Sequence, residues 1–229
     1  MKTIELFAGT KSFSKVMQVH EYQTLTIDNE IKLEPDRVAD IMTIKTLPKC
    51  DILWASPPCT TFSVASISHY WTNGKPKNEK TLYGIAMLEH TIKLIKKTKP
   101  KYWFIENPRG MMRKVIDELF TKHGIKNYKR NTLSYCQYGS KIMKPTDIWT
   151  NSPWISKPIC KPGASCHERA GRGSKTGVQG IYSLKWEKAR GNSATARGVI
   201  PPALFEEIIS QLKQLYAKTK TPTISQTLL

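Results

Sequence analysis

Long hydrophobic runs are absent from this sequence of 229 residues. No stretch approaches the roughly 18 consecutive apolar residues that a membrane-spanning helix needs, and the first residues form no apolar segment of the kind that directs secretion. The five cysteines are an odd number and follow no repeating spacing, which does not indicate a disulfide framework. We therefore expect a soluble, cytoplasmic protein with no membrane partner.

Acidic residues are also scarce. The chain has 18 Asp and Glu residues against 36 Lys and Arg residues, which gives a formal net charge of +18. Such an excess favours a polyanionic partner, although a basic solubility surface or a ribosomal or capsid-associated protein would carry the same charge. The basic residues are spread along the chain and are densest at 93–101, 122–130, 141–144 and 169–188. This distribution predicts a basic face on a folded domain rather than a basic tail.

Hydrophobic segments of strand length alternate with segments of helical periodicity. The predicted strands are residues 3–7, 24–28, 51–55, 102–106, 131–134 and 148–150, with a weaker element at 38–42. The predicted helices are residues 12–20, 81–97 and 113–123, and a last one after Pro202. This alternation predicts an α/β fold, in which helices cover both faces of a parallel sheet.

The first group of candidate residues follows the first predicted strand. Gly9 ends the string Phe7-Ala8-Gly9 and would let the backbone approach a ligand closely, and Asp28 comes at close to the ~20-residue offset at which an acid reaches ribose hydroxyls. Asp40 could face an adenine amino group in the same way. From the residues alone, a turn glycine and a helix N-cap are equally good interpretations.

The second group combines a thiol with a carboxylate. Cys59 follows a Pro-Pro pair after one predicted strand, and Glu106 and Asn107 end another. Addition to a pyrimidine ring needs a thiolate that attacks C6 and an acid that protonates N3 as charge develops there. Asn107 could brace the loop. The alternative for Cys59 is a small buried hydrophobic residue.

Three strings carry a resemblance to a known family. Residues 5–9 read Glu-Leu-Phe-Ala-Gly, residues 57–63 read Pro-Pro-Cys-Thr-Thr-Phe-Ser, and residues 106–108 read Glu-Asn-Pro. Together they resemble the DNA cytosine-5 methyltransferases, and the chain is similar to a small, phage-like member. It departs from the family pattern at residues 10–12, where further glycines are usual, at Thr60, where the family has glutamine, and at Pro108, where it has valine.

The resemblance implies an S-adenosylmethionine-dependent methyltransferase fold, a Rossmann-like doubly wound sheet with a small basic insertion. It implies three parts: a catalytic core at 1–152, a short basic recognition insertion at 153–194, and a segment at 195–229 that returns to the core. The catalytic residues it implies are Cys59, Glu106 and Asn107. S-adenosylmethionine would be held by Phe7, Ala8, Gly9, Asp28, Asp40 and Pro57.

The resemblance further implies double-stranded DNA as the partner, with the target cytosine flipped out of the helix. The family's Gln-x-Arg-x-Arg motif falls at 138–151, where neither arginine is present. The expected DNA contacts are therefore Ser63, Lys141, Lys144, Arg169 and Arg172, although Lys141 and Lys144 could equally be an ordinary solvated pair. The aromatic residues at 69–71 could close over the flipped base or could simply be packed.

Cys160, Cys166 and His167 suggest zinc, but no motif supplies a fourth ligand and Cys-x5-Cys is not a common finger spacing. We therefore expect thiols and no metal. The expected function is methylation of cytosine C5 in DNA, by a monomer in the cytoplasm or nucleoid of a bacterial host, in a phage or restriction-modification setting. An RNA cytosine-5 methyltransferase and a catalytically inactive DNA-binding relative are the alternatives.

Overall fold

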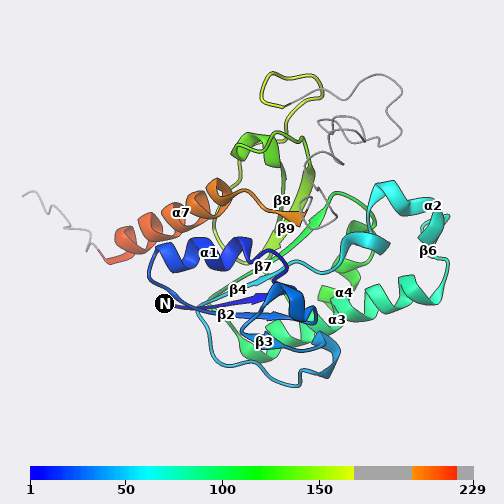
Figure 1. The fold of residues 1–229 in the computed structure, drawn as a ribbon, viewed down its shortest axis with the longest axis horizontal. Helices are drawn as coiled ribbons and strands as arrows, with labels where there is room; N and C mark the ends of the chain where they lie inside the picture. The colour runs from blue at the N-terminus through cyan, green and yellow to red at the C-terminus, as the bar shows by residue number, and fades with distance from the viewer. Residues whose placement is uncertain (168–197, 221–229) are drawn as a thin grey trace, which may run out of the picture.

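A computed structural model of the protein describes residues 1–167 and 198–220. Within these residues a seven-stranded sheet has the order β3-β2-β1-β4-β7-β9-β8 (Figure 1). Its strands are β1 (Lys2–Leu6), β2 (Gln23–Asp28), β3 (Arg37–Val38), β4 (Ile52–Ala55), β7 (Tyr102–Pro108), β8 (Lys129–Ser134) and β9 (Pro145–Thr150). The helices that flank it are α1 (Ser12–Val19), α3 (Glu79–Thr98), α4 (Ile116–Lys122) and α7 (Pro202–Lys220). The predicted α/β fold with a mostly parallel sheet is confirmed.

The expectation of a fully parallel sheet is wrong at one strand. β9 pairs antiparallel with both of its neighbours, β7 and β8, whereas the other pairs in the sheet are parallel. The connection from β8 to β9 holds only a short 3-10 helix, η6 (Tyr135–Tyr138), and a turn. A parallel connection needs a crossover of about a dozen residues or more, usually a helix, so the chain turns back instead.

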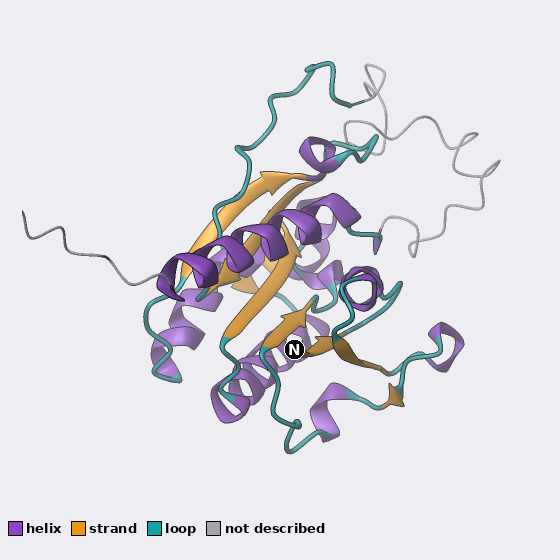
Figure 2. Cartoon of the chain, turned by 90° about the vertical axis from the view of Figure 1, so that its left-hand side faces the viewer, coloured by secondary structure: helices purple, strands orange, loops and turns teal. Residues whose placement is uncertain are grey.

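Helices cover both faces of the sheet, and each face has its own hydrophobic cluster (Figures 1 and 2). Alternate residues of a strand point to opposite faces, and β4 shows this directly. Trp54 packs under α1 and α7 against Phe13 and Phe205, whereas Leu53 joins the cluster under α3 and α4. Because both faces are covered, every residue of β4 is buried, as is usual for central strands.

The C-terminal helix α7 belongs to the core. Phe205 lies edge-on to Phe13 of α1, with 5.5 Å between ring centroids. The same cluster contains the fully buried Trp154, whose indole N–H donates to Glu207 of α7 at 3.1 Å. The packing of this cluster thus includes Trp154, two residues past residue 152, the predicted end of the catalytic core.

Several short elements connect the main ones. A two-stranded ribbon is formed by β5 (Trp71–Thr72) and β6 (Lys75–Pro76), after the one-turn helix α2 (Ile67–Tyr70). The 3-10 helices are η1 (Ile31–Leu33), η2 (Ile41–Thr43), η3 (Cys59–Thr61), η4 (Val64–Ser66), η5 (Met111–Lys114) and η6. The weak element predicted at 38–42 is two pieces, β3 and η2, separated by Ala39 and Asp40. No helix in the described part of the chain is long and apolar enough to cross a membrane.

Candidate active site

The candidate residues gather where the order of the sheet reverses. β1 lies between β2, which follows it in the chain, and β4, and the carboxyl ends of these strands meet at one edge. In open α/β sheets this is where ligands bind. Two cavities of about 100 and 230 Å³ lie at this edge, and both are lined by Phe7 and Pro58.

The loop after β1 is fixed by a buried carboxylate. Glu5, 3% exposed, accepts hydrogen bonds from the backbone N–H groups of Phe13, at 3.2 Å, and Ser14, at 2.9 Å, in the first turn of α1. A carboxylate suits the positive end of a helix. Burial nevertheless raises the pKa of Glu5 to about 7, against the hydrogen bonds, which lower it. Gly9 has a φ of +48°, a conformation that glycine adopts readily.

Asp28 joins this loop to the end of β2. Its Oδ2 accepts the N–H of Gly9 at 2.9 Å, and its Oδ1 accepts the N–H of Glu30 at 2.9 Å. A carboxylate has about four acceptor positions, so each oxygen can still accept a ligand hydroxyl. Asp40 caps η2 by accepting the N–H of Met42 at 2.9 Å. Both aspartates line the smaller cavity, so each has a structural contact and also faces the cavity.

Cys59 opens the 3-10 helix η3 and is exposed toward solvent. Its carbonyl accepts the N–H groups of Phe62 and Ser63 at 3.0 and 2.8 Å, which closes the turn. Cys59 lines the larger cavity. Because Cys59 is exposed, it is not the small buried hydrophobic residue of the alternative interpretation.

The turn that holds Cys59 is fixed by two neighbours of Thr61. The indole N–H of Trp71 donates to the Thr61 carbonyl at 2.6 Å, and Trp71 is buried. The aromatic residues at 69–71 were expected either to close over the flipped base or to be packed, and Trp71 is packed. On the other side, Gly84 of α3 lies so close that a Cβ there would be 2.4 Å from the Thr61 hydroxyl.

Glu106 and Asn107 extend from β7 beside this turn. The side-chain amide of Asn107, fully buried, donates to the Pro57 carbonyl at 2.8 Å and so connects β7 to the loop that carries Cys59. Glu106, 5% exposed, accepts the hydroxyl of Tyr135 at 2.8 Å and lines the larger cavity together with Cys59.

Tyr135 is a site residue that the sequence analysis missed. Burial raises its pKa well above the usual range, and the neighbouring Glu106 raises it further through its charge and the hydrogen bond, so the Tyr135 hydroxyl keeps its proton and donates. The ammonium of Lys144 lies 4.8 Å from the centroid of its ring. Tyr135 directly follows a predicted strand, and this position at a strand end was the available signal.

The residues predicted to contact DNA lie in different surroundings. Lys144 lines the larger cavity, and Lys141 is exposed in the turn before it. The Ser63 hydroxyl accepts the N–H of Ala65 at 3.2 Å and caps η4. Arg169 and Arg172 lie outside the described residues.

An ion pair between η5 and β9 lies close to the site, and the sequence did not indicate it. Arg113 of η5 donates through Nε and Nη2 to the two carboxylate oxygens of Asp147 on β9, each at 2.5 Å. Asp147 is fully buried and also accepts the Thr132 hydroxyl at 2.8 Å. Because a buried charge is costly without partners, these contacts hold η5 against β8 and β9.

The sheet order and the position of the cavities define the Rossmann-like α/β fold of S-adenosylmethionine-dependent methyltransferases. The chain belongs to the C-5 cytosine-specific DNA methylase family, whose model matches residues 1–130. It is 26% identical over 225 residues to a probable DNA (cytosine-5)-methyltransferase of Frog virus 3 (isolate Goorha), a match that covers 91% of this chain and 99% of that protein.

Solved structures match this chain at low sequence identity. The methyltransferase EhMeth of Entamoeba histolytica matches with a TM-score of 0.50 and 17% identity, over 69% of this chain and 55% of that one. A putative DNA modification methyltransferase encoded within an E. coli prophage matches with a TM-score of 0.47 and 13% identity, over 66% of this chain and 46% of that one. The chain thus spans about half the length of these solved structures.

Proposed function

We propose that this protein methylates C5 of cytosine in DNA, with S-adenosylmethionine as the methyl donor and Cys59 as the covalent nucleophile. The observation that carries the proposal is that Cys59 and Glu106 line one cavity at the switch point of the sheet. This cavity adjoins the smaller one, which holds Asp28 and Asp40. Family membership supports the same reaction.

The smaller cavity has the surroundings that an adenosine group needs. Phe7 and Ile41 supply apolar surface, and the carboxylates of Asp28 and Asp40 supply acceptors for hydroxyl and amino groups. The larger cavity continues from it past Glu5, whose carboxylate suits the positive charge of the donor. When bound, S-adenosylmethionine supplies an electrophilic methyl group.

In the proposed mechanism the protein activates a carbon that is otherwise a poor nucleophile. The Cys59 thiolate adds to C6 of cytosine, and N3 takes a proton from Glu106 as the ring electrons shift, which makes C5 an enamine carbon. C5 would then form a bond to the methyl group, while the bond between this methyl group and the donor sulfur breaks and the demethylated cofactor is left as a neutral thioether. Loss of the C5 proton to a base expels the Cys59 thiolate and restores the double bond, and the N3 proton returns to Glu106.

The neighbours of these groups position them. Tyr135 holds Glu106, and Asn107 connects the Glu106 strand to the Cys59 loop. The net charge of +18 suits a nucleic-acid partner, and Lys144 lies where it can meet a phosphate or the base. Base flipping would be needed because C6 is inaccessible inside a duplex. The intact Cys59 and Glu106 argue against an inactive relative.

The test uses the full chain and measures methyl transfer to nucleic acid and formation of a covalent adduct between the protein and DNA. Labelled methyl groups are followed from S-adenosylmethionine into duplex DNA and, separately, into RNA of matching sequence. In parallel, duplexes that carry 5-fluorocytosine are incubated with the cofactor and analysed on denaturing gels, because fluorine at C5 cannot leave as a proton and the adduct persists. Cys59→Ser is compared with Cys50→Ser, a substitution at a half-buried cysteine elsewhere.

We expect wild type and Cys50→Ser to methylate DNA and form the adduct, and Cys59→Ser to do neither while it still binds the cofactor. An adduct in Cys59→Ser would disprove the assignment of the nucleophile. Methylation of the RNA but not of the DNA would replace the proposed substrate with the alternative one. Monomeric state, cellular location and a restriction-modification setting stay predictions.

A further inference from the structure

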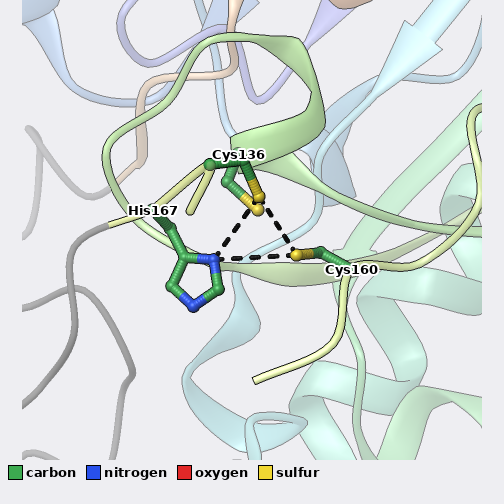
Figure 3. A group of neighbouring side chains, drawn as sticks. Cys136, Cys160 and His167 are labelled. Carbon is green, nitrogen blue, oxygen red and sulfur yellow. Dashed lines mark hydrogen bonds between the residues drawn. The ribbon is translucent and has the colours of Figure 1, made fainter. Parts of the chain in front are cut away.

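A second group of side chains lies outside the proposed active site. Cys136, Cys160, Cys166 and His167 bring their ligand atoms within 4.8 Å of one another. Figure 3 shows the side chains of Cys136, Cys160 and His167 pointing toward one another. Cys136 belongs to η6, and the other three come from the segment that follows β9. The sequence pattern indicated three of these ligands, and Cys136 supplies the fourth from an earlier part of the chain.

The distances from the His167 nitrogen to two of the sulfurs match a tetrahedral site, and those two sulfurs lie closer together than in such a site. With about 2.3 Å from zinc to sulfur and about 2.0–2.1 Å from zinc to nitrogen, tetrahedral ligands lie roughly 3.8 Å apart for two sulfurs and roughly 3.5 Å apart for sulfur and nitrogen. The Sγ atoms of Cys160 and Cys166 are 3.2 Å apart. Nδ1 of His167 lies 3.6 Å from each of them.

The surroundings keep most of these ligands away from solvent. Cys136, Cys160 and His167 are buried, and Cys166 is exposed. The N–H of Cys160 donates to the Ser134 hydroxyl at 3.1 Å, which holds this part of the segment against the end of β8. A disulfide between two of the cysteines would account for only two of the four side chains. A metal ion would account for the position of all four.

We propose that Cys136, Cys160, Cys166 and His167 bind one zinc ion in a closed Cys3His site. Thiolate and imidazole in a tetrahedral set are typical of zinc, and four protein ligands make a structural site rather than a catalytic one. Nδ1 of His167 would bind the metal and Nε2 would keep its proton. The contact from the Gly163 N–H to Nε2 is long, at 3.4 Å, so its loss costs little.

The position of the site gives it a structural role. Zinc would join the segment after β9 to η6, two parts of the chain that the sheet alone does not connect. Cys136 is the neighbour of Tyr135, the residue that holds Glu106. The zinc site would therefore fix η6 beside the larger cavity. The inference does not depend on the proposed reaction, because metal content can be measured without it.

The experiment measures bound metal in the full chain, expressed in medium supplemented with zinc and purified without a metal-affinity tag. Elemental analysis should give about one zinc per chain in wild type. Cys136→Ser and Cys160→Ser should each lose most of it, and Cys50→Ser, the matched control outside the cluster, should keep it. Replacement of zinc by cobalt should give the absorption of a tetrahedral thiolate site, and removal of zinc should lower the melting temperature.

Wild type alone decides the matter if the cluster variants fail to fold. Wild-type protein without stoichiometric metal, or with a disulfide between two of these cysteines by mass spectrometry, would overturn the proposal. Stoichiometric iron in place of zinc would overturn the choice of metal. Zinc retained in full by both cluster variants would show that it binds elsewhere.

Discussion

The hydroxyl of Tyr135 offers a direct test of how Glu106 is held. Tyr135→Phe removes one oxygen atom and keeps the buried ring, so the packing around η6 should be retained. The carboxylate of Glu106 loses the hydrogen bond of 2.8 Å and, at 5% exposure, has little access to water as a replacement. Its orientation toward the larger cavity should become less defined.

The size of the effect follows from the type of bond. A hydrogen bond to a charged group contributes about 1.5–3 kcal/mol. If this stabilisation is needed when N3 of the base takes its proton, the rate of methyl transfer should fall about 10- to 100-fold. Binding of S-adenosylmethionine should change little, because Tyr135 does not line the smaller cavity.

The matched control lies in the same 3-10 helix. Tyr138 is also buried and also donates to a glutamate at 2.8 Å, but its partner is Glu207 of α7, away from both cavities. Single-turnover methyl transfer and thermal unfolding are measured for Tyr135→Phe and Tyr138→Phe. We expect both variants to lose stability and only Tyr135→Phe to lose rate. Equal rates in the two variants would refute the positioning role of Tyr135.

Two further predictions concern the loops at the strand ends. Because the folded pKa of Glu5, about 7, is above its ordinary value of 4.5, its contribution to stability is fully present below pH 4.5 and is lost as pH rises toward 7. In urea unfolding, the free energy of unfolding of wild type should fall by about 3 kcal/mol relative to that of Glu5→Gln over this pH range. A difference between the two proteins that does not change with pH would contradict the raised pKa of Glu5. Gly84→Ala places a Cβ 2.4 Å from the Thr61 hydroxyl and should displace the Cys59 turn and slow trapping of 5-fluorocytosine DNA. Adding Thr61→Ala should restore trapping, and failure of this rescue would rule out the clash as the cause.

Much of the fold could be predicted from local pattern. The strands and helices that form the two sides of the sheet have clear hydrophobic periodicity, and the predicted segments lie within a few residues of the observed ones. The helix predicted at 113–123 is an exception, because η5 occupies its start and α4 begins at Ile116. The direction of β9 could not be read from periodicity, since a strand has the same pattern in either direction and only the length of its connection decides.

The residues of the motifs were predicted better than the hydrogen bonds that hold them in place. Asp28 and Glu106 end predicted strands and Cys59 comes shortly after one, and these residues line two adjoining cavities. The contacts that hold them, from Asn107 to Pro57 and from Tyr135 to Glu106, cross between elements that are far apart in the sequence. No local pattern indicates such pairs.

The helix η6 shows why the part played by Cys136 in the second cluster could not be predicted. Its four residues include Tyr135, which faces Glu106; Cys136, which joins the cysteine and histidine cluster; and Tyr138, which faces α7. A 3-10 helix has about three residues per turn, so the consecutive side chains of Tyr135 and Cys136 point in widely different directions and reach different neighbours. Tyr138 ends the helix one turn later and reaches α7. A segment this short has no periodicity to read. Its three contacts nevertheless connect the Glu106 strand, the proposed zinc site and the C-terminal helix. Displacement of η6 as a whole, unlike the loss of one hydroxyl group, should therefore affect all three.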